Sequence, residues 1–255
     1  MDQHDGLLSE EDRLRYQRSI LLEGFGPEGQ RKLRAGRVLV VGLGGLGSPA
    51  LYYLAAAGVG TIGVVDGDRV DLSNLQRQIL YGDGDVGQSK ALAAADRIRR
   101  CYGSVAIIVH EGRLTAENGV GMVSLYDFVI EATDNFESKF LVNDICVGLG
   151  KPFSHAAVSG YYGQAMTVVP GAGPCYRCVF GNVPSRDAVI SPDEEGTLGM
   201  VAGSLGAVQA MEAIKYLAGV GRLLVGRLFT WDGLTSTARE VTLPVEPSCP
   251  VCLKS

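Results

Sequence analysis

The chain has 255 residues, 46% of them hydrophobic, and its formal net charge at pH 7 is −5. This length supports one large buried core, and the acidic balance argues against nucleic acid as a partner. The charged N-terminal segment lacks the apolar region of a secretory signal, so we expect a cytoplasmic protein.

The first predicted elements are helices over residues 8–35. Ser9 is a typical helix N-cap, and Glu11 and Asp12 place negative charge in the first turn. The stretch from Val38 to Val65 then carries no charge, which is long enough to raise the question of a membrane span. Seven glycines and Pro49 interrupt it, so we expect strand, turn, helix and strand, and no membrane association.

Strands and helices alternate as far as residue 160. Continuous apolar runs predict strands at 37–42, 61–66, 105–110, 127–134 and 151–160, and amphipathic runs predict helices at 48–58, 89–102 and 137–150. Such alternation predicts a Rossmann-type α/β fold, with a mostly parallel sheet flanked by helices. Ligands of these sheets bind at the carboxyl ends of the strands, where we expect Gly42, Asp66 and Asp134.

The pattern changes after Gly160. Antiparallel strands are predicted at 163–170, 226–231 and 238–243, and a helix at 203–219 whose expected core residues are Leu205, Val208, Met211, Ile214 and Leu217. The polar segment 181–200 between them predicts a mobile crossover loop. We expect a single domain over 1–255, made of N-terminal helices at 8–35, a nucleotide-binding part at 36–160 and an antiparallel part at 161–255.

A glycine-rich loop follows the first strand. Gly42, Gly44 and Gly47 spell G-x-G-x-x-G, a spacing that lets phosphate approach the backbone at a helix N-terminus. Asp66 ends the next strand, where a carboxylate can accept hydrogen bonds from ribose hydroxyls. These residues predict a nucleotide site, and they do not distinguish NAD from ATP.

The charged segment 66–80 favours a triphosphate. A nicotinamide pocket needs apolar walls, whereas this segment holds Asp68, Asp71, Asn74, Arg77 and Gln78. Arg77 and Lys90 supply two cations for phosphate oxygens, and Asp134 supplies a carboxylate for Mg²⁺.

Two C-x₂-C pairs stand far apart in the chain. Cys175 with Cys178 and Cys249 with Cys252 have the spacing of a tetrahedral four-thiolate zinc site, which would be structural because no coordination position stays open. The gap between the pairs is longer than in a compact zinc ribbon, so two redox-active dithiols or two disulfides stay as alternatives.

The remaining cysteines and the histidines carry no predicted chemistry. Cys101 and Cys146 fall in predicted helices, where buried inert thiols are expected. The three histidines, His4, His110 and His155, are interpreted as structural or surface residues.

Seven motifs in order resemble the MoeB/ThiF/HesA group of adenylyltransferases, which are related to ubiquitin-activating enzymes: RYQRSILL, GLGGLGSPA, DLSNLQRQIL, ATDN, GPCYRC, GSLGAVQAMEAIKYLAG and CPVC. The resemblance covers roughly residues 12–253. It implies that Gly45 lies in the nucleotide loop, that Asp66 binds ribose, and that Asp134 holds Mg²⁺. It also implies a nucleotide-binding set that includes Asp68, Asn74, Arg77, Gln78 and Lys90. Arg18 resembles an arginine that family dimers insert into the neighbouring subunit's site, which implies a homodimer.

The activity that this resemblance implies is ATP-dependent adenylation of a small ubiquitin-fold sulfur carrier that ends in Gly-Gly, with a sulfurtransferase or cysteine desulfurase as a further partner. The pathway, whether molybdopterin, thiamine or another, is open. Many family members carry a cysteine in the crossover loop, whereas this chain has Ser191 near that place, so we expect no thiol intermediate there.

Two other classes of function stay as alternatives to adenylation. An NAD(P)-dependent oxidoreductase would leave Arg77 and Lys90 without a role. A non-catalytic binding partner is disfavoured because Asp66, Arg77, Lys90 and Asp134 are all present.

Overall fold

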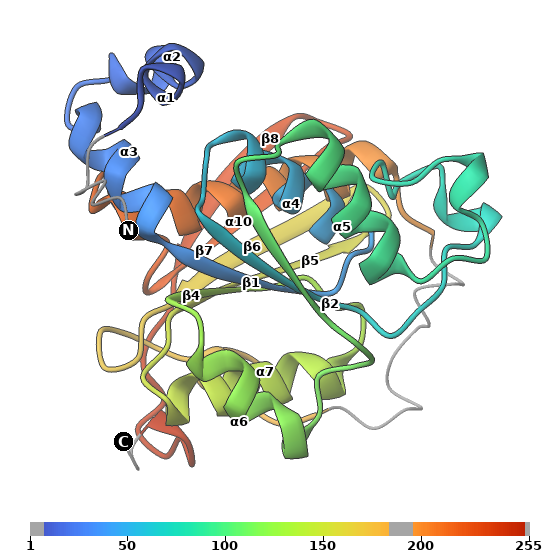
Figure 1. The fold of residues 1–255 in the computed structure, drawn as a ribbon. Coiled ribbons are helices and arrows are strands. Elements are labelled where there is room, and N and C mark those ends of the chain that lie inside the picture. Colours follow the sequence, from blue (N-terminus) through green and yellow to red (C-terminus); the bar gives the residue numbers. More distant parts are fainter. Residues whose placement is uncertain (1–7, 184–195, 253–255) are drawn as a thin grey trace.

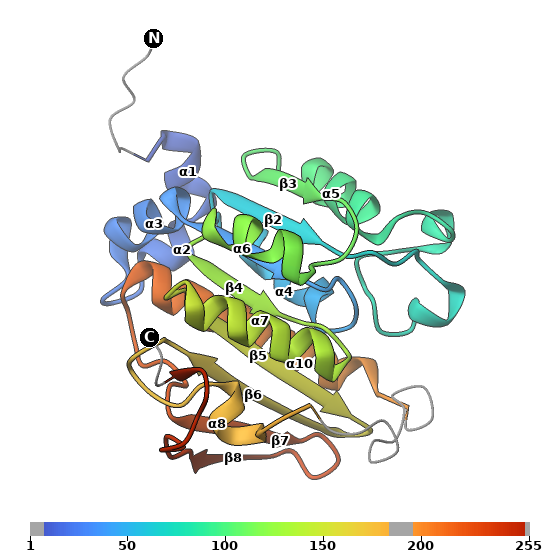
Figure 2. The same cartoon turned by 90° about the horizontal axis from the view of Figure 1, so that it is seen from below.

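The computed structural model describes residues 8–183 and 196–252 and contains an eight-stranded sheet in the order β3-β2-β1-β4-β5-β6-β7-β8 (Figures 1 and 2). Neighbouring strands are parallel from β3 to β5 and antiparallel from β5 to β8. The predicted change of pattern near Gly160 is therefore confirmed. The strands are β1 (Arg37–Val41), β2 (Thr61–Val65), β3 (Ala106–His110), β4 (Phe128–Glu131), β5 (Phe153–Ser159), β6 (Tyr162–Val168), β7 (Arg227–Asp232) and β8 (Thr237–Thr242).

Helices cover both faces of this sheet. One face carries α4 (Gly47–Ala56), α5 (Lys90–Cys101) and α10 (Gly199–Ala218), and the other carries α6 (Ala116–Ser124) and α7 (Phe136–Gly148) (Figure 1). The strand β1 is buried on both sides because Val38 and Val40 pack into the core under α4, whereas Leu39 and Val41 pack into the core under α7. Because both faces of β1 are buried, its sequence is a continuous apolar run rather than an alternating one.

Three short helices precede the sheet: α1 (Glu10–Arg15), α2 (Gln17–Ile20) and α3 (Gly26–Ala35). The predicted cap is confirmed, since the Ser9 hydroxyl accepts from the backbone N–H of Asp12. These helices lie beside the amino ends of the parallel strands, because α3 leads directly into β1 and the N–H of Gly60 donates to the carbonyl of Leu33. They are thus at the opposite end of the sheet from the glycine-rich loop.

The buried side of α10 differs from the prediction in one residue. Leu205 is fully buried and Val208, Ile214 and Leu217 pack against the core, but Met211 is 55% exposed. The buried stripe instead includes the polar residues Gln209 and Glu212, whose hydrogen bonds are described below. A prediction from apolar spacing alone was wrong at Met211 because buried polar groups occupy part of the core-facing stripe.

Other features were not foreseen or differ from expectation. The helices α6 and α8 (Tyr176–Phe180) were not predicted. Cys146 is buried as expected, whereas Cys101 is exposed at the last residue of α5, so its predicted burial was wrong. His4, Ser191 and most of the predicted crossover loop lie outside the described residues. Among the helices of 8–183 and 196–252, none is long and apolar enough to span a bilayer.

Candidate nucleotide site and cysteine cluster

A cavity of about 1090 Å³ opens at the carboxyl ends of β1, β2 and β4. This is the edge at which ligands of doubly wound sheets bind. Nine of the predicted nucleotide-binding residues line this cavity: Gly42, Gly44, Gly45, Asp66, Asp68, Arg77, Gln78, Lys90 and Asp134. Three other residues of the predicted site, Gly47, Asn74 and Arg18, lie elsewhere, as described below.

The glycine-rich loop is shaped by two close backbone approaches. Gly42 has φ of 89°, and a Cβ there would lie 2.6 Å from the carbonyl oxygen of Ala132. At Gly47, the first residue of α4, a Cβ would lie 1.9 Å from the carbonyl oxygen of Gly42. Only glycine is compatible with these positions, so Gly47 closes the turn beneath the cavity while Gly44 and Gly45 face the cavity.

Asp66 holds this loop against the end of β2. Its Oδ2 accepts from the backbone N–H of Leu43 at 2.7 Å, and its Oδ1 accepts from the N–H of Asp68 at 2.8 Å. The phenol of Tyr81 donates to the carbonyl of Leu43 at 3.1 Å and supports the same loop from beneath. Each carboxylate oxygen has a second lone pair, so Asp66 can still accept hydrogen bonds from a ribose.

Lys90 and Arg113 meet at Asp68. The Nζ of the buried Lys90 lies 3.4 Å from Asp68 Oδ2, and a guanidinium nitrogen of Arg113 lies 2.6 Å from Asp68 Oδ1. Lys90 is held there because it opens α5, whose cap is the hydroxyl of Ser89. Arg113 adds a cation to the cavity wall that the sequence analysis did not single out.

Arg77 and Gln78 lie beyond the glycine-rich loop. The side chain of Arg77 passes over Gly45, with its guanidinium bonded to the carbonyl of Ser73 at 3.1 Å. Gln78 is buried and its Oε1 has no hydrogen-bond partner among the described residues, so it can serve a ligand in the cavity. Asn74 does not line the cavity; its side chain accepts from the N–H of Asp71 and closes the turn before Arg77.

Asp134 stands exposed on the turn between β4 and α7, facing the cavity. Asn135, the next residue, caps α7 by accepting from the N–H of Ser138 at 2.8 Å. A carboxylate oxygen is a ligand that Mg²⁺ prefers, so the chemistry of this position fits the predicted ion.

A buried ion pair lies directly under this turn. Glu131 and Lys139 are 3.2 Å apart, and His155 Nδ1 lies 2.6 Å from the same carboxylate. Burial opposes ionisation of Glu131, but the charge of Lys139 and the bond from His155 lower its pKa to about 2. Burial and the charge of Lys139 lower the pKa of His155, so the ring is neutral and donates its Nδ1–H to Glu131.

Arg18 is far from this cavity within its own chain. It is exposed on α2, whereas the cavity lies at the carboxyl ends of the strands. A five-residue strand spans about 16 Å, and the N-terminal helices pack at the other end of it. Arg18 therefore does not contribute to the site of the chain that carries it.

The cavity continues from Asp134 onto the antiparallel strands. This second arm is lined by Ser159, Tyr162 and Gln164 of β5 and β6, by Thr230, Trp231, Thr237 and Arg239 of β7 and β8, and by Tyr176 and Phe180 of α8. Its walls mix aromatic rings with hydroxyl and amide groups, as in many ligand pockets.

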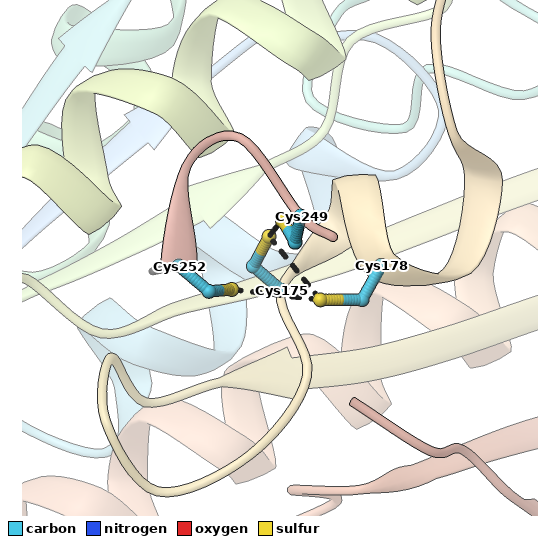
Figure 3. Close-up of side chains that lie close together, drawn as sticks. All are labelled: Cys175, Cys178, Cys249 and Cys252. Atoms are coloured by element: carbon cyan, nitrogen blue, oxygen red, sulfur yellow. Dashed lines mark hydrogen bonds between the residues drawn. The ribbon is translucent and has the colours of Figure 1, made fainter. Parts of the chain in front are cut away.

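The four predicted cysteine ligands form one cluster beside α8 (Figure 3). Neighbouring sulfurs are separated by 4.0 Å (Cys175–Cys178), 3.7 Å (Cys175–Cys249) and 3.5 Å (Cys178–Cys252). Zn–S bonds of about 2.3 Å in a tetrahedron place sulfurs about 3.8 Å apart, so the geometry fits a metal ion and is too wide for disulfides. Burial raises the pKa of Cys249, but the hydrogen bonds from the backbone N–H groups of Cys252 and Val251 outweigh this effect and lower the pKa to about 7.

Some residues at this site were missed by the sequence analysis: Tyr81, Arg113, Glu131, Thr133 and Lys139. Glu131 had a readable signal, because a charge at the end of an otherwise apolar strand is rarely buried unless it is paired. Lys139 lies eight residues later, in the first turn of α7, and this separation across a turn indicates no contact by itself.

Solved structures with the same fold include Escherichia coli MccB bound to N-formylated MccA. It superposes with a TM-score of 0.84 at 22% sequence identity, over 96% of this chain and 77% of that chain. At this identity the comparison establishes the fold alone.

Curated relatives are much closer in sequence. The chain is 44% identical to a sulfur carrier protein adenylyltransferase of Thermus thermophilus, over 96% of this chain and 92% of the relative. It is 44% identical to the SAMP-activating enzyme E1 of Haloferax volcanii, over 93% and 88%. It spans 52% of the maize adenylyltransferase and sulfurtransferase MOCS3-2, at 43% identity. The ThiF family model matches residues 16–251, and the chain therefore belongs to the ThiF family.

Proposed function

We propose that this protein adenylates the C-terminal glycine carboxylate of a small ubiquitin-fold sulfur carrier, using ATP. The observation that carries the proposal is the single cavity in which the glycine-rich loop, Asp66, Arg77, Lys90 and Asp134 meet, and which continues onto the antiparallel strands. Two relatives at 44% identity are named for activating proteins of this kind.

ATP binds with its ribose at Asp66 and its phosphates against the glycine-rich loop. Lys90 and Arg77 line the cavity and neutralise the phosphate oxygens, and the unpartnered Oε1 of Gln78 can accept from a hydroxyl or amino group of the nucleotide. Asn74 joins this set if the turn that it closes with Asp71 opens toward the phosphates.

Asp134 is the residue that would hold Mg²⁺. The ion supplies charge neutralisation at the phosphates when bound. Asp134 lines the same cavity as the glycine-rich loop and the residues of β6 and β7, which supports a position for its carboxylate beside the reacting groups.

The chemical step is a substitution at phosphorus. A carboxylate oxygen of the carrier's last glycine forms a bond to the α-phosphorus of ATP. The bond from that phosphorus to the bridging oxygen breaks, and pyrophosphate leaves with the electron pair. The product is an acyl-adenylate, ready for later thiocarboxylate formation. Positioning and charge neutralisation by Arg77 and Lys90 drive this step, and no general base is needed because the nucleophile is already ionised.

The second arm of the cavity receives the carrier's tail. An extended tail can lie over Gln164 and Thr230 and reach Asp134 with its terminal carboxylate. Tyr162 and Trp231 also line this part of the cavity, so the small Gly-Gly end passes beside their rings.

Zinc is the metal that we assign to the four cysteine sulfurs, because a four-thiolate site with tetrahedral spacing suits that ion. All four positions are taken by protein sulfur, so the ion is structural. It ties the segment around Cys249 to α8, and α8 contributes Tyr176 and Phe180 to the cavity wall.

Arg18 acts in the site of a neighbouring copy. Since it lies at the far end of its own sheet, a homodimer is needed to bring it to a nucleotide, where it stabilises developing phosphate charge. A sulfurtransferase or cysteine desulfurase then supplies sulfur to the activated carrier, and the whole reaction is cytoplasmic.

ATP–pyrophosphate exchange tests this function. Purified protein is incubated with ATP, labelled pyrophosphate and candidate carriers, each also made without its last glycine as a matched control. Exchange that requires the intact carrier supports the proposal. ATP binding without exchange for any carrier would instead indicate a non-catalytic binding protein.

A further inference from the structure

We infer that Glu131 and Lys139 are positioning residues that clamp Thr133 and thereby hold Asp134 in place for the nucleotide. The inference rests on the proposed function, since it gives Asp134 its role. The evidence is the buried Glu131–Lys139 ion pair beneath the Asp134 turn. Both side chains of this pair make all of their hydrogen bonds to neighbouring protein atoms.

The Glu131 carboxylate is fully occupied. Its Oε1 accepts from the backbone N–H of Thr133 at 2.8 Å and from the Thr133 hydroxyl. Its Oε2 accepts from Lys139 at 3.2 Å and from His155 at 2.6 Å. A carboxylate has about four acceptor positions, so none is left for a ligand or a water.

The Lys139 ammonium is occupied in the same way. It has three N–H donors, and they reach Glu131, the carbonyl of Thr133 at 2.5 Å and the carbonyl of Ala156 at 3.2 Å. Lys139 borders the cavity but is buried, so it cannot donate to a phosphate without breaking one of these bonds. It therefore acts through Thr133 rather than on the nucleotide.

Thr133 is consequently held at its N–H, its carbonyl and its hydroxyl. Asp134 follows it directly, so the direction of the Asp134 side chain depends on this clamp. The residue before Thr133 is fixed as well, because the N–H of Ala132 donates to Val41 and the Ala132 carbonyl packs against Gly42. The clamp thus sets the Asp134 turn relative to the glycine-rich loop.

Two further groups hold the clamp from outside. Gln209 of α10 donates to the carbonyl of Glu131 at 2.7 Å and to the carbonyl of Ser154 at 3.0 Å. The ring of His155 packs edge-on against Tyr176, the residue that follows the cysteine ligand Cys175.

The test uses Lys139→Met and the double variant Glu131→Gln/Lys139→Met. The single variant leaves the Glu131 charge unpaired and can unfold, whereas the double variant has no buried charge and keeps the packing volume. Lys151→Met is the matched control, since Lys151 also donates to a backbone carbonyl, that of Tyr126, but at the other end of α7. Two readouts need no turnover: hydrogen–deuterium exchange of peptides covering 132–136, and calorimetric ATP affinity with and without Mg²⁺.

We expect faster exchange at 132–136 in the double variant and at least a tenfold loss of the affinity that Mg²⁺ adds to ATP binding, because displacing a catalytic group by about 1 Å can cost about 100-fold. ATP affinity without Mg²⁺ and the Lys151→Met protein should match wild type. A folded double variant with wild-type exchange at 132–136, or with the full Mg²⁺ effect, would overturn the inference. Absence of pyrophosphate exchange in the wild type would instead count against the proposed function, and the deuterium result is independent of it.

Discussion

The carboxylate of Asp66 accepts a hydrogen bond from the backbone N–H of Leu43 at 2.7 Å, which joins the end of β2 to the glycine-rich loop after β1. One side chain thereby shapes the phosphate-binding loop and stands where a ribose is expected. Both roles should be visible when the charge and the hydrogen-bonding oxygen are removed separately.

Asp66→Asn keeps an oxygen that can accept from Leu43, whereas Asp66→Ala removes it. Hydrogen bonds to charged groups contribute about 1.5–3 kcal/mol, so we expect Asp66→Asn to weaken ATP binding about 10- to 100-fold. Its amide nitrogen cannot accept from the N–H of Asp68, so its melting temperature should fall, but by less than that of Asp66→Ala. Asp66→Ala should weaken binding at least as much and also lower the melting temperature. Calorimetric titration with ATP measures the first effect. An Asp66→Asn protein with wild-type ATP affinity would show that the carboxylate only supports the loop.

Zinc removal should affect folding more than chemistry. A structural zinc site can contribute on the order of 10 kcal/mol, so Cys249→Ser is expected to lose the metal and to unfold at a much lower temperature. Cys101→Ser is the matched control, because Cys101 is exposed and outside the cluster. Metal analysis and thermal unfolding check this prediction. Freshly purified wild-type protein with far less than one zinc per chain would contradict the assignment.

Arg18 and Asp134 should complement each other between subunits. Arg18→Ala and Asp134→Ala are each expected to abolish pyrophosphate exchange as pure homodimers. When equal amounts of the two variants re-associate at random, about half of the dimers are heterodimers, and each heterodimer has one intact site out of two. The mixture should therefore recover about a quarter of wild-type activity. A mixture of the two inactive variants that stays inactive after subunit exchange, verified by native mass spectrometry, would show that Arg18 acts within its own chain, and an active Arg18→Ala homodimer would show that it does not act.

Stability should fall on mild acidification because of His155. Its pKa in the folded protein is lowered from the ordinary 6.5, so the unfolded chain binds the extra proton first. The free energy of unfolding should therefore decrease as the pH falls below about 6.5, by up to about 1.4 kcal/mol per pH unit. Glu131, with its pKa lowered from 4.5 to about 2, adds a further loss below pH 4.5.

His155→Gln should remove the first of these two losses and keep the second. His110→Gln is the comparison: burial also lowers the pKa of His110, but that ring is only partly buried, so this variant should remove a smaller part of the first loss than His155→Gln does. Denaturant unfolding at pH 7.5, 6.5 and 5.5 measures the slope. An unchanged slope in His155→Gln would mean that the pKa of His155 is the same in the folded and the unfolded chain, which would contradict the prediction.

The carboxyl ends of β1 and β2 were predictable from sequence because they are set by neighbouring residues in the chain. The apolar run of β1 must stop where the chain turns, and the glycines at 42 and 47 mark that turn by their missing side chains. Asp66 follows a second run of the same kind, so its meeting with the loop follows from parallel pairing of the two strands.

The buried polar contacts were not predictable in the same way. Gln209 and Glu212 lie on the core side of α10 because their partners come from distant segments: Glu212 accepts from Thr167 at 2.6 Å and from the N–H of Leu224 at 2.7 Å. Apolar spacing alone therefore placed Met211 in the core. The helix α6 was missed for a local reason, since its two glycines, Gly119 and Gly121, lower helix propensity.

The central claim is that a carrier's terminal carboxylate is joined to AMP. The most direct measurement is the intact mass of a Gly-Gly-terminated carrier after incubation with this protein, ATP, Mg²⁺ and pyrophosphatase. The account predicts a carrier heavier by one AMP, located at its last glycine and absent when Asp134→Ala replaces the wild type. A carrier of unchanged mass with ATP converted to ADP, or an adduct at any other residue, would contradict it.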